Sequence, residues 1–246
     1  MNFDLNSQVR RELGYHLIDV VDKFFDSLPE RPVQLPLEER SYPSHLNPLP
    51  ESADDPAKVL DEVCRELIDN GFHVPSAHYL GMMNPTPTYM SFLAESLVSA
   101  LNPQLASVAR SQLASRIEAE AVRWVGGLVG WPSAFSGTFT SGGNEANFSA
   151  LAMAMSHYFP DLIEEGRTSI GAQPVFYASV EGHHSLDKSA GLLGIGRKAL
   201  RGIPVNDRLE MDAEKLEASI ERDLAAGQRL REGGGRLCSM KIYASG

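Results

Sequence analysis

The stretch Thr140-Ser141-Gly142-Gly143-Asn144-Glu145-Ala146-Asn147 is the part of the chain that decides its expected fold. Residues 137–141 have the pattern of a short strand, and the Ala- and Met-rich residues 144–158 have that of a helix. Two glycines at such a junction let the backbone approach a ligand closely, and the first amides of the helix favour an anion such as phosphate. The alternative is a plain tight turn with Ser141 or Asn144 as the N-cap, and the local pattern supports both equally.

Segments of strand and helix character alternate downstream of this turn. We expect strands at residues 174–179, 199–205 and 237–244, and helices at residues 184–193 and 212–226, the last with Asp212 as N-cap. Alternation of this kind implies a largely parallel sheet that is covered by helices. The sequence therefore predicts an α/β domain, in which ligands lie beyond the carboxyl ends of the strands.

Upstream of the turn, the chain is expected to be helical with an extended connector. Apolar residues recur at helical spacing over residues 7–28, and Asp55 is the expected N-cap of a helix that Gly71 closes. Residues 29–56 contain seven of the 15 prolines, which is typical of an extended segment. Further helices are expected at residues 88–101 and 115–129. The first helix is therefore expected to be an arm that packs on another body, such as a second subunit.

Two further segments are candidate sites. His183 and His184 follow an expected strand, where a histidine is suited to acid–base chemistry, to a metal or to stacking on an aromatic cofactor. Neither a helical His-x-x-x-His pair nor a cysteine cluster supports a metal. Residues 72–88 form an apolar loop that is suited to line a pocket, with Asn84 as an inward polar group. Taken alone, each segment is better explained as a surface histidine pair or as a loop folded over the core.

Composition sets the class of protein. The 246 residues carry a formal charge of −10, which disfavours non-specific binding to nucleic acid or to an anionic membrane. Cys64 and Cys238 are too few for a disulfide framework, and no apolar run is long enough to span a membrane. The first residues lack the apolar stretch of a signal peptide. A cytoplasmic protein is therefore expected.

Taken together and in order, five segments resemble the group II pyridoxal-phosphate-dependent amino-acid decarboxylases. The segments are Leu17-Ile18-Asp19, His78-Tyr79-Leu80-Gly81 through Asn84-Pro85-Thr86-Pro87, Ser115-Arg116-Ile117-Glu118-Ala119-Glu120, the glycine turn, and His184-Ser185-Leu186-Asp187-Lys188-Ser189-Ala190. The resemblance implies a large domain of fold type I, truncated and preceded by a helical arm. It divides the chain into residues 1–87, the arm and pocket loop, and residues 88–246, a partial cofactor-binding domain. It also implies an obligate homodimer with active sites at the interface and the arm wrapped around the partner.

The same resemblance implies pyridoxal 5′-phosphate as cofactor and an L-amino acid as substrate. It assigns the cofactor phosphate to Gly143 and Asn144, the cofactor ring to His184, and the substrate pocket to Tyr79 and Asn84. His183 lies one residue from the matching position and is the second choice for the ring. In this chemistry the cofactor withdraws electrons from Cα, and the bond to the carboxylate breaks to release CO2.

The chain departs from the family pattern at the catalytic lysine and aspartate. In the family, the Schiff-base lysine and the aspartate that faces the pyridinium nitrogen lie downstream of a strand that residues 240–246 resemble. No lysine of this chain stands in that context, the lysines being Lys23, Lys58, Lys188, Lys198, Lys215 and Lys241. We therefore assign no catalytic residue, and we expect the N-terminal half of a carboxy-lyase without activity of its own. Two alternatives remain: a non-catalytic dimerisation or scaffold module, and an aldehyde-lyase reaction such as cleavage of a phosphorylated sphingoid base. The His184-to-Lys188 spacing occurs in such lyases, whereas the Asn84-Pro85 loop and the arm favour decarboxylation.

Overall fold

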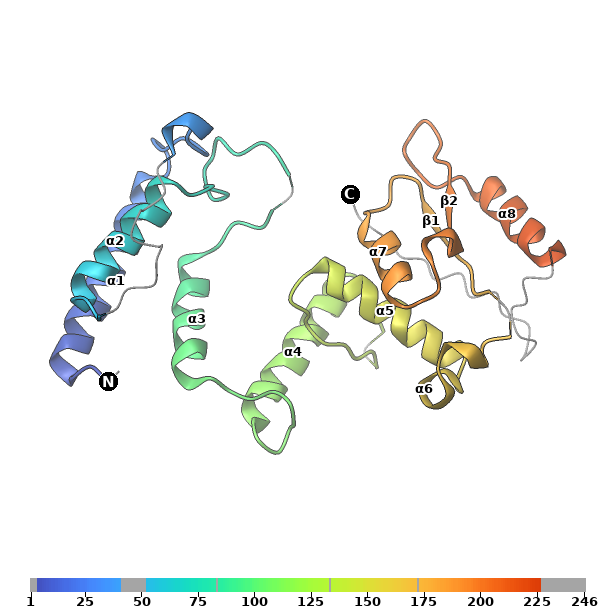
Figure 1. Ribbon diagram of the computed structural model, residues 1–246, viewed down its shortest axis with the longest axis horizontal. Helices are drawn as coiled ribbons and strands as arrows, with labels where there is room; N and C mark the ends of the chain where they lie inside the picture. The colour runs from blue at the N-terminus through green and yellow to red at the C-terminus, as the bar shows by residue number, and fades with distance from the viewer. Residues whose placement is uncertain (1–3, 41–51, 83, 133, 172, 227–246) are drawn as a thin grey trace. The chain divides into compact units, whose positions relative to one another are not determined.

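The computed structural model describes residues 4–40, 52–82, 84–132, 134–171 and 173–226 (Figure 1). It divides into two compact units, Met1–Pro103 and Gln104–Gly246, each of which is described by itself. The expected strand at residues 237–244 and the segment 240–246 lie outside the described residues, as do Cys238 and Lys241. None of the described helices is long and apolar enough to cross a membrane.

The first unit is built from paired helices. Helix α1, Ser7–Ser27, begins at Asn6, whose side chain accepts a hydrogen bond from the Val9 amide. Helix α2, Pro56–Asp69, begins at Asp55, whose carboxylate accepts from two amides of the first turn. The two helices pack on each other, and His16 Nε2 lies 2.5 Å from Asp61 Oδ1 across the pair. Both helices and the Asp55 cap confirm the sequence prediction.

Gly71 has a different role from the predicted one. The last turn of α2 is closed by Asn70, with φ −100°, and Gly71 does not adopt the left-handed conformation of a helix-ending glycine. Instead, a Cβ on Gly71 would lie 2.4 Å from the carbonyl oxygen of Leu67. The prediction of a left-handed C-cap is therefore wrong, and a glycine is needed because the backbone passes close to the helix end.

The rest of the first unit is a short 3-10 turn, a loop and a third helix. The turn is η1, Leu37–Glu39. In the loop before Thr88, His73 and Ser76 are buried, and the His73 ring packs against Phe24, whereas Leu80 is 92% exposed, so only the first part of this loop packs within its unit. Helix α3, Tyr89–Leu101, begins at Thr88, which forms a reciprocal capping box with Ser91.

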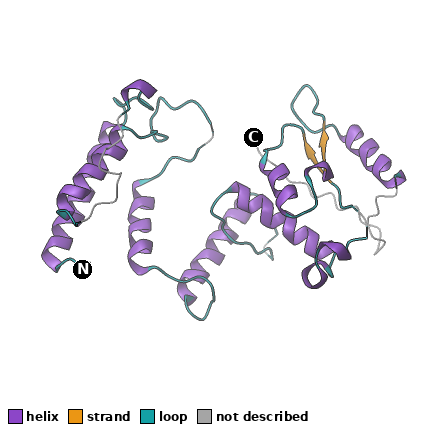
Figure 2. Cartoon of the chain, viewed as in Figure 1, coloured by secondary structure: helices purple, strands orange, loops and turns teal. Residues whose placement is uncertain are grey.

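The second unit has a small parallel sheet surrounded by helices (Figure 2). Its elements are α4 Gln112–Leu128, α5 Gly143–Tyr158, α6 Leu162–Glu165, η3 Arg167–Ser169, β1 Phe176–Ser179, α7 Ser185–Leu192, η4 Arg197–Ala199, β2 Leu200–Ile203 and α8 Ala213–Ala225. Strands β1 and β2 are parallel, with Phe176 opposite Leu200 and Ser179 opposite Ile203. Helix α7 connects them, which confirms the predicted α/β alternation.

The core of the second unit lies around α5, α7 and the sheet. One buried cluster joins Met155 of α5 and Ala190 of α7 with Ile195 and Ala199. A second cluster joins Leu151, Ala178 and Leu186. Helix α5 therefore packs against α7 along its length, and this packing fixes the start of each helix relative to the other.

The predicted strand at residues 137–141 does not form. The Phe139 amide donates to Glu118 Oε1 at 3.0 Å, and the Ser141 amide donates to Glu145 Oε2 at 2.8 Å. A strand would need these amides for a neighbouring strand, whereas here carboxylates take them. The prediction is wrong because side chains satisfy this backbone.

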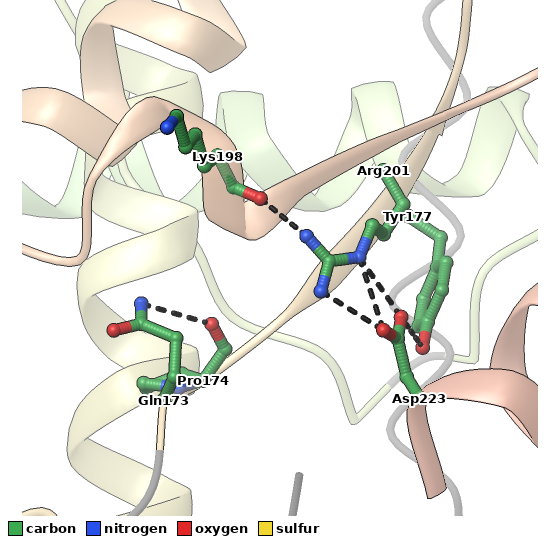
Figure 3. Close-up of polar contacts among 6 residues, drawn as sticks. All are labelled: Gln173, Pro174, Tyr177, Lys198, Arg201 and Asp223. Carbon is green, nitrogen blue, oxygen red and sulfur yellow. Dashed lines mark hydrogen bonds and ion pairs between the residues drawn. The ribbon is translucent and has the colours of Figure 1, made fainter. Parts of the chain in front are cut away.

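Helix α8 is attached to the sheet by a polar network (Figure 3). Asp223 accepts from Arg201 Nε and Nη2 and from the Tyr177 hydroxyl, the last at 2.9 Å. The hydrogen bonds from Arg201 lower the pKa of Asp223. Burial, with help from the hydrogen bond to Asp223, raises the pKa of Tyr177 to about 12. The Arg201 guanidinium also donates to the Lys198 carbonyl, so one side chain ties β2, η4 and α8 together.

Candidate functional site

The glycine turn opens directly onto the start of α5. Gly142 is the N-cap and supplies no side chain, so neither Ser141 nor Asn144 caps the helix as one alternative had predicted. Glu145 instead reaches back, and its Oε2 accepts from both the amide and the hydroxyl of Ser141, at 2.8 and 2.6 Å. The first helical bond of the turn runs from the Ala146 amide to the Gly142 carbonyl.

The amides of Gly143 and Asn144 are available to an anion. In the described part of the chain neither amide has a hydrogen-bond partner, as expected for the first turn of a helix. A Cβ built on Gly142 or Gly143 would meet nothing within 4 Å, so the space beside the turn is open. Free donors, open space and the positive end of the helix dipole together suit a phosphate group.

A second carboxylate, that of Glu118, bonds to the residues that precede this turn. Glu118 of α4 accepts from the Thr138 hydroxyl at 2.8 Å and from the Phe139 amide at 3.0 Å. The backbone hydrogen bond from Phe139 lowers the pKa of Glu118, and the hydroxyl hydrogen bond from Ser141 lowers that of Glu145. Both carboxylates are therefore ionised at neutral pH, and together they bond to Thr138, Phe139 and Ser141, just before the turn.

The histidine pair lies at the start of α7. The two rings are 4.1 Å apart between centroids and tilted by 33°. His183 Nδ1 lies 2.9 Å from Ser185 Oγ and accepts from the Ser185 amide at 3.2 Å. The His184 ring has no hydrogen bond among the described residues, and both histidines are exposed. The ring of His183 is therefore the better fixed of the two.

One hydrogen bond joins the histidine pair to the helix of the glycine turn. Asn147 of α5 donates from Nδ2 to Ser185 Oγ at 2.7 Å. The structure thus brings the predicted phosphate residues, Gly143 and Asn144, and the predicted ring residue, His184, onto two helices that pack together.

The predicted substrate residues contact each other in the first unit. The Tyr79 hydroxyl donates to Asn84 Oδ1 at 2.8 Å, and it accepts from the Met82 amide. The Tyr79 ring packs edge-on against Phe72, with 5.3 Å between centroids. The Tyr79 side chain therefore links Met82 and Asn84 to each other.

Sequence reasoning missed the supporting residues of the site. Glu118 and Asn147 lie in segments that carry the family resemblance, but the sequence pattern predicted no role for either residue. The signal for Glu145 was its place in the first turn of a helix, where a carboxylate bonds free amides. Among the described residues, no group of three or more His, Cys, Asp or Glu side chains is placed to hold a metal.

Comparisons with known proteins match the chain to one family. Residues 39–230 match the model of the pyridoxal-dependent decarboxylase conserved domain. The chain is 25% identical over 229 residues to an aromatic-L-amino-acid decarboxylase of Bacillus atrophaeus, covering 93% of this chain and 46% of that protein. The chain spans about a third to a half of the length of the curated relatives it matches.

Solved structures show the same fold. The crystal structure of mouse CSAD aligns with a TM-score of 0.80 and 21% identity, over 90% of this chain and 47% of that one. The structure of Rhodiola rosea 4-hydroxyphenylacetaldehyde synthase aligns with a TM-score of 0.78 and 22% identity, over 91% of this chain and 49% of that one. These likenesses confirm the predicted fold of the type I large domain.

Proposed function

The chain belongs to the pyridoxal-dependent decarboxylase family, and on that premise we propose that it forms the phosphate- and ring-binding part of an amino-acid decarboxylase. The observation that carries the proposal is the open two-glycine turn at the start of α5, joined to a histidine pair on α7. Bound pyridoxal phosphate supplies an electron-withdrawing ring that weakens the bond between Cα and the carboxylate of an L-amino acid. The residues of this chain bind and orient that group.

The turn would hold the phosphate through its backbone. The amides of Gly143 and Asn144 donate to the phosphate oxygens, and the dipole of α5 favours the negative charge. Gly142 leaves room for the phosphate because it has no side chain. Glu118 and Glu145 do not contact the phosphate in this scheme. They hold the backbone before α5 in place, so that the amides are already oriented before the ligand arrives.

The histidine pair would supply the ring that stacks on the cofactor. Family resemblance assigns this role to His184, whereas the hydrogen bonds of Ser185 hold His183. Because the two rings face each other at 4.1 Å, only one of them is next to the cofactor. The variants His183→Gln and His184→Gln separate the two assignments, since removal of the stacking ring weakens cofactor binding and changes the cofactor absorbance.

Tyr79 and Asn84 are proposed to contact the amino-acid substrate. Their mutual hydrogen bond holds the tyrosine ring at the edge of an apolar loop, as a pocket for an amino-acid side chain requires. The named relative acts on aromatic amino acids, while the aligned plant enzyme is an aldehyde synthase. Product analysis that separates amine from aldehyde is therefore the test of the reaction type.

A homodimer in the cytoplasm is the proposed working form of the whole protein. Large apolar side chains on α4 are exposed, Trp124 at 71% and Leu128 at 88%, as expected of a surface that a partner covers. The acidic composition and the two cysteines support the cytoplasm. Sedimentation of the purified chain measures the association.

Family membership favours decarboxylation over the aldehyde-lyase alternative, and failure to bind the cofactor would favour the scaffold alternative.

The test of the proposed function fills the open space at the turn. Gly142 is extended, with φ 169° and ψ 171°, so Gly142→Val is compatible with its backbone yet places methyl groups where the phosphate would lie. We expect the variant to bind pyridoxal phosphate at least about tenfold more weakly, measured by absorbance titration of the 246-residue chain. Gly127→Val on α4 is the matched control, because Gly127 also has open space around its Cβ position. Equal affinity of the two variants would refute the proposal.

A further inference from the structure

A directed chain of hydrogen bonds runs from α5 to the ring of His183. Asn147 Nδ2 lies 2.7 Å from Ser185 Oγ, which lies 2.9 Å from His183 Nδ1. Ser185 is 1% exposed, so water does not compete for its hydroxyl. These contacts join the helix of the glycine turn to the histidine through a buried side chain.

The backbone amide of Ser185 decides which ring nitrogen of His183 carries the hydrogen. This amide lies 3.2 Å from His183 Nδ1, and an amide is only a donor. Nδ1 must therefore be the acceptor, and in the neutral ring the hydrogen is on Nε2. The amide belongs to the first residue of α7, so the His183 ring also caps that helix.

The side chains are consistent with the same direction. Asn147 donates its amide hydrogen to Ser185 Oγ, which leaves the hydroxyl hydrogen to point at another acceptor. His183 Nδ1 is the acceptor within reach. Two donors, the amide and the hydroxyl of Ser185, thus converge on Nδ1, and the amide group of Asn147 fixes the orientation of the hydroxyl.

We propose that Asn147 and Ser185 are positioning residues that hold His183 in the neutral Nε2–H tautomer with its ring plane fixed. The consequence rests on the proposed function: the fixed, neutral ring of His183 lies 4.1 Å from the ring of His184 and supports the histidine that the resemblance assigns to the cofactor ring. Among the described residues, Nε2 of His183 has no partner.

The test reads the tautomer directly in the 246-residue chain without cofactor. Long-range nitrogen–hydrogen NMR correlations at about pH 8.5, where an ordinary histidine is neutral, distinguish a protonated from an unprotonated Nδ1. His183→Gln assigns the signal. We expect His183 to show an unprotonated Nδ1, and a protonated Nδ1 would overturn the proposal.

Asn147→Asp tests the direction of the chain. A carboxylate accepts the Ser185 hydroxyl hydrogen, so the hydroxyl oxygen then accepts from a protonated Nδ1 in place of donating to it. We expect the tautomer ratio of His183 to shift toward Nδ1–H by about five- to tenfold, the effect of one hydrogen bond. Gln104→Glu makes the same change at an exposed amide that accepts from Arg110, and it should leave the ratio unchanged.

A ratio in Asn147→Asp within about twofold of the parent chain would overturn the proposal, since one hydrogen bond is expected to change it more than that. Ser185→Ala adds a second measurement: it removes one of the two donors to Nδ1 and leaves the backbone amide, so the tautomer ratio should shift in the same direction as in Asn147→Asp but by a smaller factor. Because these measurements need no cofactor, their failure is distinct from failure of the Gly142→Val titration, which concerns the phosphate.

Discussion

Individual carboxylates shape the backbone that leads into the glycine turn. Glu118 takes the Phe139 amide and the Thr138 hydroxyl, and Glu145 takes both polar groups of Ser141. Glu145 is exposed and Glu118 is half-buried, so we expect their main effect to be on local order and not on the global free energy of unfolding. The value of these residues lies in presenting the next amides, those of Gly143 and Asn144, to a ligand.

The first prediction concerns the pH dependence of this local order. Hydrogen bonds lower the pKa of Glu118 and Glu145 below the ordinary 4.5, so their contribution is present above that value. It is lost only as the pH falls through the lowered pKa, when the carboxylate gains a proton. We expect the amide proton shifts of Phe139 and Ser141 to stay constant from neutral pH to about pH 5 and to change with midpoints below 4.5.

A single substitution separates the two carboxylates. Glu118→Gln should remove the transition at Phe139 and leave that at Ser141, because Ser141 bonds to Glu145. Glu120→Gln is the control on the same helix, since Glu120 forms an ion pair with Arg123 at the surface. Midpoints above 4.5, or loss of both transitions in Glu118→Gln, would contradict the assignment of these bonds.

At the scale of elements, α8 depends on one charge network for its attachment to the sheet. Asp223 has a side-chain exposure of 12%, against 28% for Arg201, so the pair is largely removed from water. The Tyr177 hydroxyl adds a third bond from β1. Removal of the Asp223 carboxylate would leave the Arg201 guanidinium without hydrogen bonds to both of its oxygens.

The second prediction is that Asp223→Asn lowers the free energy of unfolding by about 2 kcal/mol, less than for a fully buried pair because Arg201 keeps partial access to water. Tyr177→Phe should cost about 1 kcal/mol, the value of a single neutral-to-charged contact at a half-buried site. Urea unfolding followed by circular dichroism measures both. Glu217→Gln, an exposed change on the same helix, should have no effect, and an equal loss in that control would show that charge on α8 alone is responsible.

Elements were predictable from the sequence where a local signal decides them. The caps at Asp55 and Asp212, the apolar spacing of α1, and the alternation of β1, α7 and β2 all act over a few residues. The strand expected at residues 137–141 does not form, and one reason was not visible locally: the Phe139 amide bonds to Glu118, which is distant in sequence. The link from Asn147 to Ser185 was invisible for the same reason, since it depends on how α5 packs against α7.

At the scale of the whole molecule, the residues named in the proposed function occur in both units, which the structure describes separately. The first holds Tyr79 and Asn84, and the second holds the glycine turn and the histidine pair. Exposed apolar side chains occur in both units, such as Leu101 at 68% in the first and Leu128 at 88% in the second. Each unit thus exposes large apolar side chains, as is common for surfaces that a binding partner covers.

The last prediction concerns how the whole chain binds its cofactor. A lysine forms a covalent link to an aldehyde only as the free amine, which burial or a neighbouring cation favours. The five described lysines are all exposed; Lys58 pairs with Asp54 at 2.8 Å and Lys215 with Asp212 at 3.5 Å. The bond to Asp54 raises the pKa of Lys58, which keeps it protonated. We therefore expect the 246-residue chain to bind pyridoxal phosphate without a stoichiometric link to one lysine.

Borohydride reduction of the complex, followed by mass spectrometric mapping, measures this link. Scattered low-level labelling of exposed lysines is the expected result, and Lys188→Arg should leave it unchanged although Lys188 follows the histidine pair on α7. A full adduct at one lysine, together with CO2 release that depends on an added amino acid, would show instead that the chain catalyses the reaction with its own residues. Loss of that adduct in Lys188→Arg would then identify the residue, because arginine keeps the charge but forms no such link.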